Sequence, residues 1–146
     1  MKTFLFAWNA EKWKWPTLKD DILELRQTGI FVEDWSCASH KSVKIGDAAF
    51  LIKLGKEPRG IIGSGFVSSE PFEGTNHSGK HRIRVMINFE TLRDPFTERI
   101  LDMETLNSGI LSKQHWSTQS SGISIKNDVA DELKQVWKEF LRTSAR

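Results

Sequence analysis

Apolar and polar residues alternate along several stretches of the chain, which is the pattern of β-strands with a buried face. Phe4, Phe6 and Trp8 share one side of residues 3–8, and this two-residue period predicts a strand. A longer alternation over 81–89 predicts a second strand, with Arg82 and Arg84 on its outward side.

Two apolar runs, 48–54 and 60–68, are joined by the turn residues Gly55-Lys56-Glu57-Pro58-Arg59. Apolar runs joined by such a turn predict a β-hairpin. We expect this hairpin to form the middle of the sheet.

Helical spacing occurs near both ends of the chain. The apolar side of the first helix is formed by Leu18, Ile22 and Leu25. Thr17 and Asp20 have the spacing of a capping box at its start, and Gly29 is expected to end it. Residues 129–141 repeat the spacing after Asn127, which predicts a closing amphipathic helix with Asn127 as its cap.

The remaining segments carry weaker patterns. Short strands are expected over 31–35 and 123–125, a short helix within 103–111, and a loop over the polar residues 70–80. No repeat or linker divides residues 1–146. Strands that cluster between an early and a late helix predict one α+β domain with a strongly curved sheet or small barrel.

The length of 146 residues suffices for one domain with its own hydrophobic core. No apolar run approaches the roughly 20 residues of a membrane-spanning helix. The N-terminus has no basic stretch followed by a signal-peptide cleavage site. We therefore expect a cytoplasmic protein without membrane contact. A single cysteine, Cys37, excludes an internal disulfide, and we expect neither a structural metal nor a cofactor.

Charge is unevenly distributed along the chain. The whole chain carries a net charge of +2. Three segments are basic, because 2–15 carries +2, 36–59 carries +3 and 75–89 carries +3. The rest of the chain is therefore acidic, and the fold can present one basic face to a nucleic acid, although a solvated basic surface is the alternative.

The chain has six tryptophans, nine phenylalanines and no tyrosine, more indole rings than one core usually needs. We expect Trp8 and Trp137 to pack in the core, because they fall on a strand and on a helix face. Four tryptophans stand in loop-like segments beside lysines and serines: Trp13, Trp15, Trp35 and Trp116. Aromatic rings interleaved with lysines are typical of sites that stack bases and hold phosphates. The alternative that some of these rings fill the barrel ends stays open.

Patterns for catalysis or metal binding are sparse. Cys37 and His40 could pair as thiol and base, so a small Cys37-dependent hydrolase is one alternative. His77 and His81 have metal-ligand spacing only on a helix, whereas the glycine, serine and asparagine around them predict a loop. We expect no enzymatic activity in this domain.

Seven short motifs follow one another through nearly the whole chain. They are Phe4-Leu5-Phe6-Ala7-Trp8-Asn9, Trp35-Ser36-Cys37, Gly46-Asp47-Ala48-Ala49-Phe50-Leu51-Ile52, Leu54-Gly55, Pro58-Arg59-Gly60-Ile61, Gln114-His115-Trp116-Ser117 and Gln119-Ser120-Ser121-Gly122-Ile123. In this order they resemble the EVE domain of the PUA-like superfamily, which is related to YTH and ASCH domains. The resemblance implies a PUA-like curved β-barrel with flanking helices that reads modified bases.

The nearest resemblance is to bacterial EVE domains linked to HNH-type restriction endonucleases. It implies recognition of 5-methylcytosine or 5-hydroxymethylcytosine in double-stranded DNA, with the base flipped into an aromatic pocket. The chain would be the targeting module of a modification-dependent restriction system. Nuclease activity would then reside in a separate domain or partner.

The same resemblance implies the pocket residues. In YTH domains a Trp-Cys-Ser tripeptide forms one wall of an aromatic cage, and Trp35-Ser36-Cys37 is similar to it, with Trp35 as the first stacking ring. The end of the first strand adds Trp8 and Asn9. The loop that supplies the second wall has no tryptophan here. The candidates for that wall are Phe72, His77, Trp15 and Trp116.

Polar partners complete the expected site. A hydroxymethyl group could receive a hydrogen bond from Ser36, Ser120 or Ser121. Phosphate contacts are expected from Lys12, Lys14, Lys41, Arg59, Arg82 and Arg84. A binder of modified or single-stranded RNA is the alternative binding function, because a flipped base looks alike in either polymer.

Overall fold

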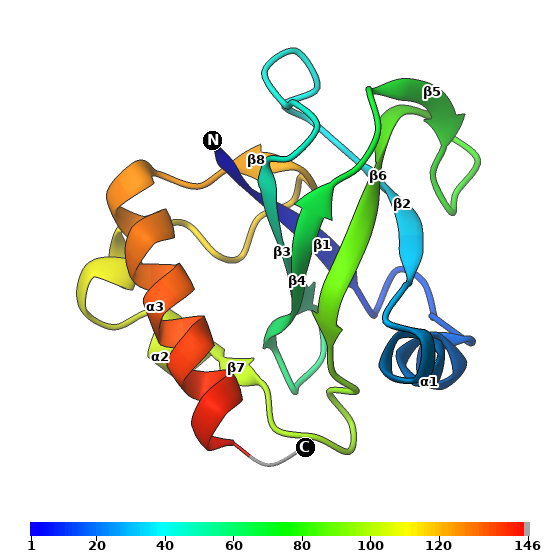
Figure 1. Cartoon of the computed structure of the whole chain (residues 1–146). Coiled ribbons are helices and arrows are strands. Elements are labelled where there is room, and N and C mark those ends of the chain that lie inside the picture. Colours follow the sequence, from blue (N-terminus) through cyan, green and yellow to red (C-terminus); the bar gives the residue numbers. More distant parts are fainter. Residues whose placement is uncertain (145–146) are drawn as a thin grey trace.

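A single curved sheet organises the protein (Figure 1). The structure is a computed structural model and describes residues 1–144. The strands are β1 (Thr3–Asn9), β2 (Val32–Ser36), β3 (Ala48–Leu54), β4 (Gly60–Val67), β5 (Phe72–Thr75), β6 (His81–Leu92), β7 (Leu101–Asp102) and β8 (Ile123–Ser124). Their order is β2-β6-β4-β3-β1-β8, with β5 added to β6 and β7 added to β4. The predicted β3–β4 hairpin therefore lies in the middle of the sheet, as expected.

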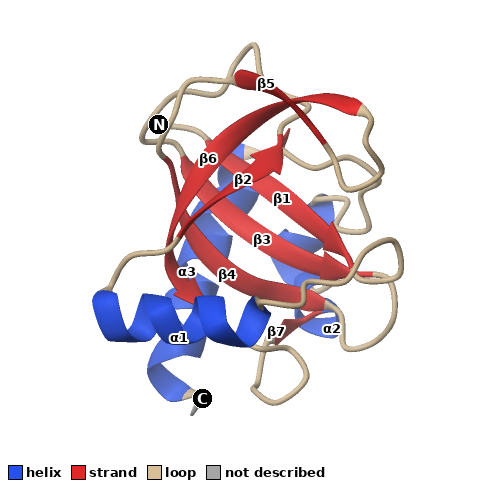
Figure 2. Ribbon diagram, turned by 90° about the vertical axis from the view of Figure 1, so that its right-hand side faces the viewer, coloured by secondary structure: helices blue, strands red, loops and turns tan. Residues whose placement is uncertain are grey.

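Helices cover both faces of the sheet, as Figures 1 and 2 show. They are α1 (Leu18–Thr28), α2 (Met103–Leu106), the 3₁₀ helix η1 (Gly109–Lys113) and α3 (Asn127–Thr143). Alternation along β1 explains why two cores form. Phe4 and Phe6 enter the core beneath α1, while Leu5 enters the core beneath α3. All three side chains are buried, because each face of the strand meets a helical layer.

The first helix forms where its spacing predicts. Leu18, Ile22 and Leu25 are buried, and Gly29 ends the helix in the left-handed conformation with φ of 77°. The capping box itself does not form. Thr17 Oγ1 donates to Asp21 Oδ2 at 2.9 Å, so this hydroxyl bonds a side chain of the first turn instead of a free backbone N–H.

Several boundaries differ from the predictions. The 70–80 segment, expected to be a loop, contains strand β5, because pairing with β6 supplies the hydrogen bonds that its own sequence does not signal. The expected helix over 103–111 is split into α2 and η1. The cap of α3 is Lys126, one residue before Asn127. None of the helices within residues 1–144 has the length and apolar content that crossing a membrane requires.

The position of Arg84 also differs from the prediction. Its side chain is not outward but buried, with 7% of its surface exposed. The guanidinium forms an ion pair with Asp34 and donates to Ser36 Oγ at 2.9 Å. Both partners belong to β2, the neighbouring strand, where Ser36 pairs directly with Arg84. Arg84 therefore ties β2 to β6 and does not act as a free cation.

Candidate functional site

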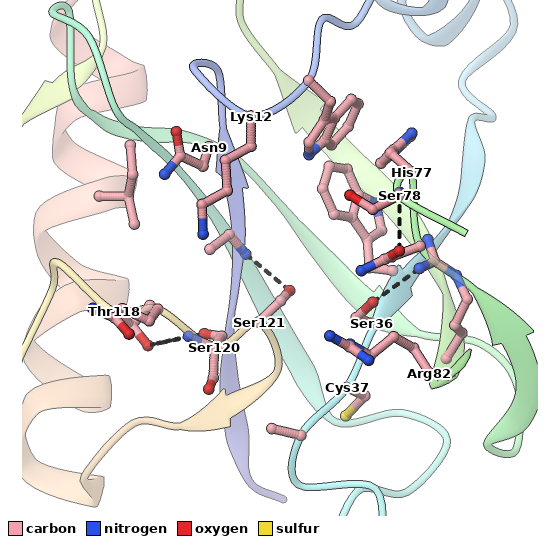
Figure 3. Close-up of a pocket in the computed structure, with 18 of the residues that line it drawn as sticks. Asn9, Lys12, Ser36, Cys37, His77, Ser78, Arg82, Thr118, Ser120 and Ser121 are labelled. Atoms are coloured by element: carbon pink, nitrogen blue, oxygen red, sulfur yellow. Dashed lines mark hydrogen bonds between the residues drawn. The ribbon is translucent and has the colours of Figure 1, made fainter. Parts of the chain in front are cut away.

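A cavity of about 790 Å³ opens where several strand ends meet. Its walls come from the end of β1 and the loop after it, the end of β2, the β3–β4 turn, the loop between β5 and β6, and residues 117–121. Figure 3 shows side chains from these segments facing one another, with Ser36 and Cys37 on one side and Ser120 and Ser121 on the other. The sheet thus assembles segments that are far apart in the sequence.

Hydrogen bonds to Ser121 hold residues 117–121, the serine loop, at the cavity. Ser121 Oγ accepts from the N–H of Ala7 at 3.0 Å, and the N–H of Ala38 donates to the Ser121 carbonyl at 2.8 Å. Gly122 has φ of +77°, and a Cβ there would lie 2.5 Å from Cys37 Cα. Only glycine permits this approach. The structure therefore brings Ser36, Cys37, Ser120 and Ser121 together, as the sequence predicted.

The aromatic wall of the cavity is built from Trp13 and Trp35. Their ring centroids lie 5.8 Å apart and their planes are tilted by 48°. Carbon atoms in contact are about 3.5–4.0 Å apart, so a base held between two parallel rings needs a gap of about 7–8 Å. The two rings leave no such gap. Trp35 is 4% exposed and Trp13 is half-buried, so Trp13 offers the more accessible ring.

Within the described chain, two buried side-chain donors have no hydrogen-bond acceptor: Nε1 of Trp35 and Nε of Arg59. Both residues line the cavity. A buried donor without a partner costs free energy, and it is satisfied when a ligand supplies an acceptor. A ligand in the cavity can satisfy these two donors only if its acceptor atoms reach past the surface of the side chains that cover them.

Arg59 is positioned by the β3–β4 turn. The turn is held by Lys53, a fully buried lysine whose Nζ donates to the carbonyls of Lys56 at 2.6 Å and Pro58 at 2.7 Å. Burial lowers the pKa of Lys53 below its ordinary value. Arg59 Nη2 in turn donates to Ser117 Oγ at 2.8 Å, which links the turn to the serine loop.

The predicted phosphate-binding residues fall into three groups. Lys12, Arg59 and Arg82 line the cavity, whereas Lys14 and Lys41 are exposed outside its lining. Arg84 also lines it but is held by Asp34 and Ser36, which corrects its expected role as a free phosphate contact.

Asn9 lines the cavity as predicted, with part of its hydrogen-bonding capacity used locally. Its Oδ1 accepts from the N–H of Glu11 at 3.0 Å and so holds the turn that follows β1. The amide oxygen thus shapes the loop that carries Lys12 and Trp13.

Four predicted pocket residues lie outside the cavity lining. Trp8 and Trp15 are buried in the core beneath α1, where Trp8 Nε1 donates to the Trp13 carbonyl and Trp15 Nε1 donates to Asp21. Trp116 is 1% exposed in the other core. Phe72 is partly exposed on β5. The suggestion that Trp15, Trp116 or Phe72 closes the cage is therefore corrected by their positions.

Trp13 is not among the pocket residues that the family resemblance implies, although it stands between Lys12 and Lys14 in a loop-like segment. The structure places Trp13 in the cavity wall and stacks His77 on it, with centroids 3.6 Å apart. Of the four candidates for the second wall, His77 is the one that lines the cavity, and it is the aromatic side chain that the β5–β6 loop contributes. The available signal was an indole between two lysines directly after a strand end.

The Cys37 thiol is not activated. Its side chain is 2% exposed and its Sγ donates to the Gly122 carbonyl at 3.8 Å. Burial raises the pKa of Cys37 to about 11. A nucleophilic cysteine needs a lowered pKa, so this environment argues against the Cys37-dependent hydrolase.

We predict that Cys37 reacts slowly in the folded protein. With a pKa of about 11, only about one thiol in a thousand is thiolate at pH 8. Alkylation by iodoacetamide at pH 8 is expected to be at least roughly 100-fold slower in the native protein than in urea, and to quicken as the pH rises towards 11. Mass spectrometry of timed samples measures both rates. Rapid labelling of the native thiol would restore the hydrolase hypothesis.

Metal ligation has no support among residues 1–144, where no group of three or more histidine, cysteine, aspartate or glutamate side chains is placed to hold an ion. The ring of His77 is engaged with Trp13, and His81 Nε2 lies 3.4 Å from Glu73. The two histidines that have metal-ligand spacing in the sequence therefore have other contacts.

Comparisons with known proteins show the fold. No protein-family model matches the sequence, and no curated protein matches it significantly. A hypothetical protein from Leishmania major is similar in structure, with a TM-score of 0.65, 13% identity and 97% of each chain covered. Protein PSPTO5229 from Pseudomonas syringae has a TM-score of 0.62 and 12% identity over 92% of this chain and 98% of its own.

The third similar structure is the YTH domain-containing protein mmi1 in a complex with RNA. Its TM-score is 0.51 at 15% identity, covering 97% of this chain and 86% of that chain. The chain therefore has a PUA/YTH-like fold, and the predicted α+β class with a curved sheet and flanking helices is confirmed. Membership of the EVE family in particular stays a prediction.

Proposed function

We propose that this protein is a non-catalytic reader of modified cytosine in DNA that receives the flipped base in the cavity beside Trp13. The observation that carries the proposal is the composition of that cavity. It combines the half-buried indole of Trp13, serine hydroxyls and two buried donors without acceptors with Lys12, Arg59 and Arg82 in one recess. The resemblance to restriction-linked EVE domains and the PUA/YTH-like fold support the same interpretation.

The energetics of base flipping explain why the cavity needs both rings and cations. Extruding a base from a duplex costs a few kcal/mol. One aromatic stack returns about 1–3 kcal/mol. The rest has to come from the phosphates, which the cationic side chains at the cavity can contact. A recess with stacking surface alone would bind a duplex weakly.

Discrimination between cytosine and its modified forms is expected to be modest. Burying one methyl group contributes only about 0.8 kcal/mol, which is a few-fold in affinity. A hydroxymethyl group can add a hydrogen bond of roughly 1 kcal/mol. Ser36, Ser120 and Ser121 are the hydroxyls at the cavity that can make it. In a restriction system such a domain would supply targeting, and a separate nuclease domain or subunit would cleave.

A binding panel tests the proposal. Duplexes carrying cytosine, 5-methylcytosine, 5-hydroxymethylcytosine or methylated adenine at one position are titrated by fluorescence anisotropy at fixed salt. We expect the two modified-cytosine duplexes to bind a few-fold more tightly than the cytosine duplex, and the methylated-adenine duplex to show no such gain. Equal affinity for all four duplexes would rule out modified-cytosine reading.

RNA is the second candidate ligand, because one of the structures with this fold is a complex with RNA. A competition experiment separates the two polymers. Labelled methylated duplex is displaced by unlabelled duplex or by single-stranded RNA of the same sequence. Displacement by RNA at lower concentration than by methylated duplex would favour the RNA alternative.

We predict that Arg82→Ala weakens binding to all duplexes alike. Arg82 is exposed at the cavity and contributes one positive charge at its edge. The logarithm of the binding constant falls as the logarithm of the salt concentration rises. Removing one phosphate contact should make this fall shallower, reducing the magnitude of the slope by about 0.9. Salt titrations of the four duplexes measure this slope. Arg142→Ala is the control, since Arg142 is exposed on α3 and paired with Glu139. A loss confined to modified duplexes would contradict a phosphate role.

A further inference from the structure

We propose that the outer face of Trp13 is the stacking surface for the flipped base, and that His77 occupies this place in the unbound protein. The inference rests on the proposed function, because it assigns the position of the base within the same cavity. It makes His77 a residue that the base displaces, and not a second wall of the cage.

The stacking geometry carries this inference. The His77 imidazole lies 3.6 Å from Trp13 between centroids, with the planes inclined by only 19°. This is the distance and the near-parallel arrangement that a stacked base would adopt. The other rings around Trp13 are Trp8, Trp15 and Trp35, all 5.8 Å or farther and tilted by 33° or more. These three rings pack against Trp13 from the core, so the face towards the cavity is the one His77 covers.

The gap between Trp13 and Trp35 offers the base no alternative place. Their centroids are 5.8 Å apart, which is too close for a base between them. Trp35 is buried in the core against Trp15 and Phe89, so it cannot withdraw without disturbing that packing. A base that stacks on Trp13 therefore has to take the position of the imidazole.

The loop that carries His77 allows its ring to leave without unfolding. Asn76 Oδ1 accepts from the N–H groups of Ser78 at 2.9 Å and Lys80 at 3.0 Å. The N–H of Asn76 donates to the Lys80 carbonyl at 2.9 Å. These bonds hold the tip of the β5–β6 hairpin through Asn76, and none involves the imidazole. Rotation of the exposed His77 side chain thus frees Trp13 while the backbone turn stays closed.

The contact is an exchangeable stack of neutral rings. Burial and the nearby Arg84 lower the pKa of His77, whereas Asp34 opposes this shift. The lowered pKa favours the neutral form of the imidazole. One planar ring can replace another there.

Displacement predicts the direction of a mutational effect. When a binding site is open for only a fraction of the time, the apparent affinity is reduced by that fraction. Removing the competing ring should therefore tighten binding of the modified duplex by roughly threefold to tenfold. A histidine that formed a second wall would have the opposite effect, because its removal would weaken binding.

The experiment compares His77→Ala with wild type on the 5-methylcytosine duplex. We expect tighter binding, and no gain from His77→Ala when it is combined with Trp13→Ala, because the covered surface is then absent. His115→Ala is the matched control, since this histidine is exposed and outside the cavity lining. Weaker or unchanged binding by His77→Ala would overturn the inference.

A spectroscopic measurement checks displacement directly. Stacked at 3.6 Å on Trp13, the His77 ring protons should be shifted upfield in the NMR spectrum of the free protein. Saturation with modified duplex should move them towards random-coil positions. Upfield signals that persist at saturation would overturn the inference while leaving DNA binding intact. If wild type binds none of the duplexes and no RNA, the proposed function fails as well.

Discussion

Replacing Trp13 by alanine is expected to weaken binding of modified-cytosine duplexes by roughly 5- to 150-fold, because one base–aromatic stack contributes about 1–3 kcal/mol. The fold should tolerate the change. Trp13 is half-buried in the loop after β1, and the atom that Trp8 Nε1 contacts is the Trp13 backbone carbonyl, which alanine retains. Anisotropy titrations give the affinity, and thermal unfolding verifies that the variant is folded.

Two further variants isolate the stacking role. Trp13→Phe keeps an aromatic face and should retain most of the affinity. Phe96→Ala removes an exposed aromatic ring that lies outside the cavity lining, and should leave the affinity unchanged. If Trp13→Ala binds modified duplex as well as wild type does, Trp13 is not the stacking surface. The His77 inference would then fail with it.

Local sequence patterns predicted the helices and strands that have a buried apolar face of their own. These elements are β1, the β3–β4 hairpin, α1 and α3. In each of them the spacing of apolar residues within the segment is enough to predict which side is buried. Strand β5 is different. Its four residues are Phe72-Glu73-Gly74-Thr75, and it exists as a strand through pairing with β6. Strand formation of this kind depends on a partner that the segment's own sequence does not specify.

The orientation of Arg84 could not be read from alternation either. Polar residues opposite an apolar row are expected to face solvent. Here the register between β2 and β6 sets Ser36 beside Arg84, and Asp34 supplies the opposite charge. An arginine can be buried when it is paired and hydrogen-bonded. The partners lie on another strand, so only the fold brings them together.

The candidate site was predictable in outline and not in its aromatic members. The motifs placed Ser36, Cys37 and the serine loop together correctly. The tryptophans were harder to sort, because an indole is buried when its N–H finds an acceptor. Trp116 Nε1 donates to the carbonyls of Leu106 and Leu111, each at 2.9 Å, and these acceptors come from α2 and η1. The sequence gives no sign of that pairing.

Trp13 and Trp15 show that burial of a tryptophan depends on the local conformation of the chain. They are two residues apart in one loop, yet Trp15 is buried with its Nε1 bonded to Asp21 at 2.8 Å, while Trp13 lines the cavity. Trp8 Nε1, which donates to the Trp13 carbonyl at 3.1 Å, fixes the loop between them and β1. The sequence around the two indoles is similar, so it does not predict which one is buried. The loop conformation places Trp15 in the core and Trp13 at the cavity.

Replacing Trp35 by alanine is expected to lower the free energy of unfolding by about 3–5 kcal/mol, as deletion of a buried large aromatic side chain does. Only 4% of its surface is exposed, and it packs on Trp13, Trp15 and Phe89. Since domains are stable by about 5–15 kcal/mol, the loss is a large share of the total. Urea unfolding followed by circular dichroism measures it. An unchanged midpoint together with lost base discrimination would make Trp35 an exposed stacking wall instead.

Trp35→Phe distinguishes two possible roles of Trp35, which are a direct hydrogen bond from Nε1 to the base and packing support for Trp13. Phenylalanine keeps most of the buried ring and removes the N–H that has no acceptor, so it should destabilise the fold far less than alanine does. If an acceptor on the bound base reaches Nε1, the same variant should weaken binding while the fold stays stable. Retained affinity would instead show that Trp35 makes no direct contact with the base. Trp35 would then affect binding only by holding Trp13 in place.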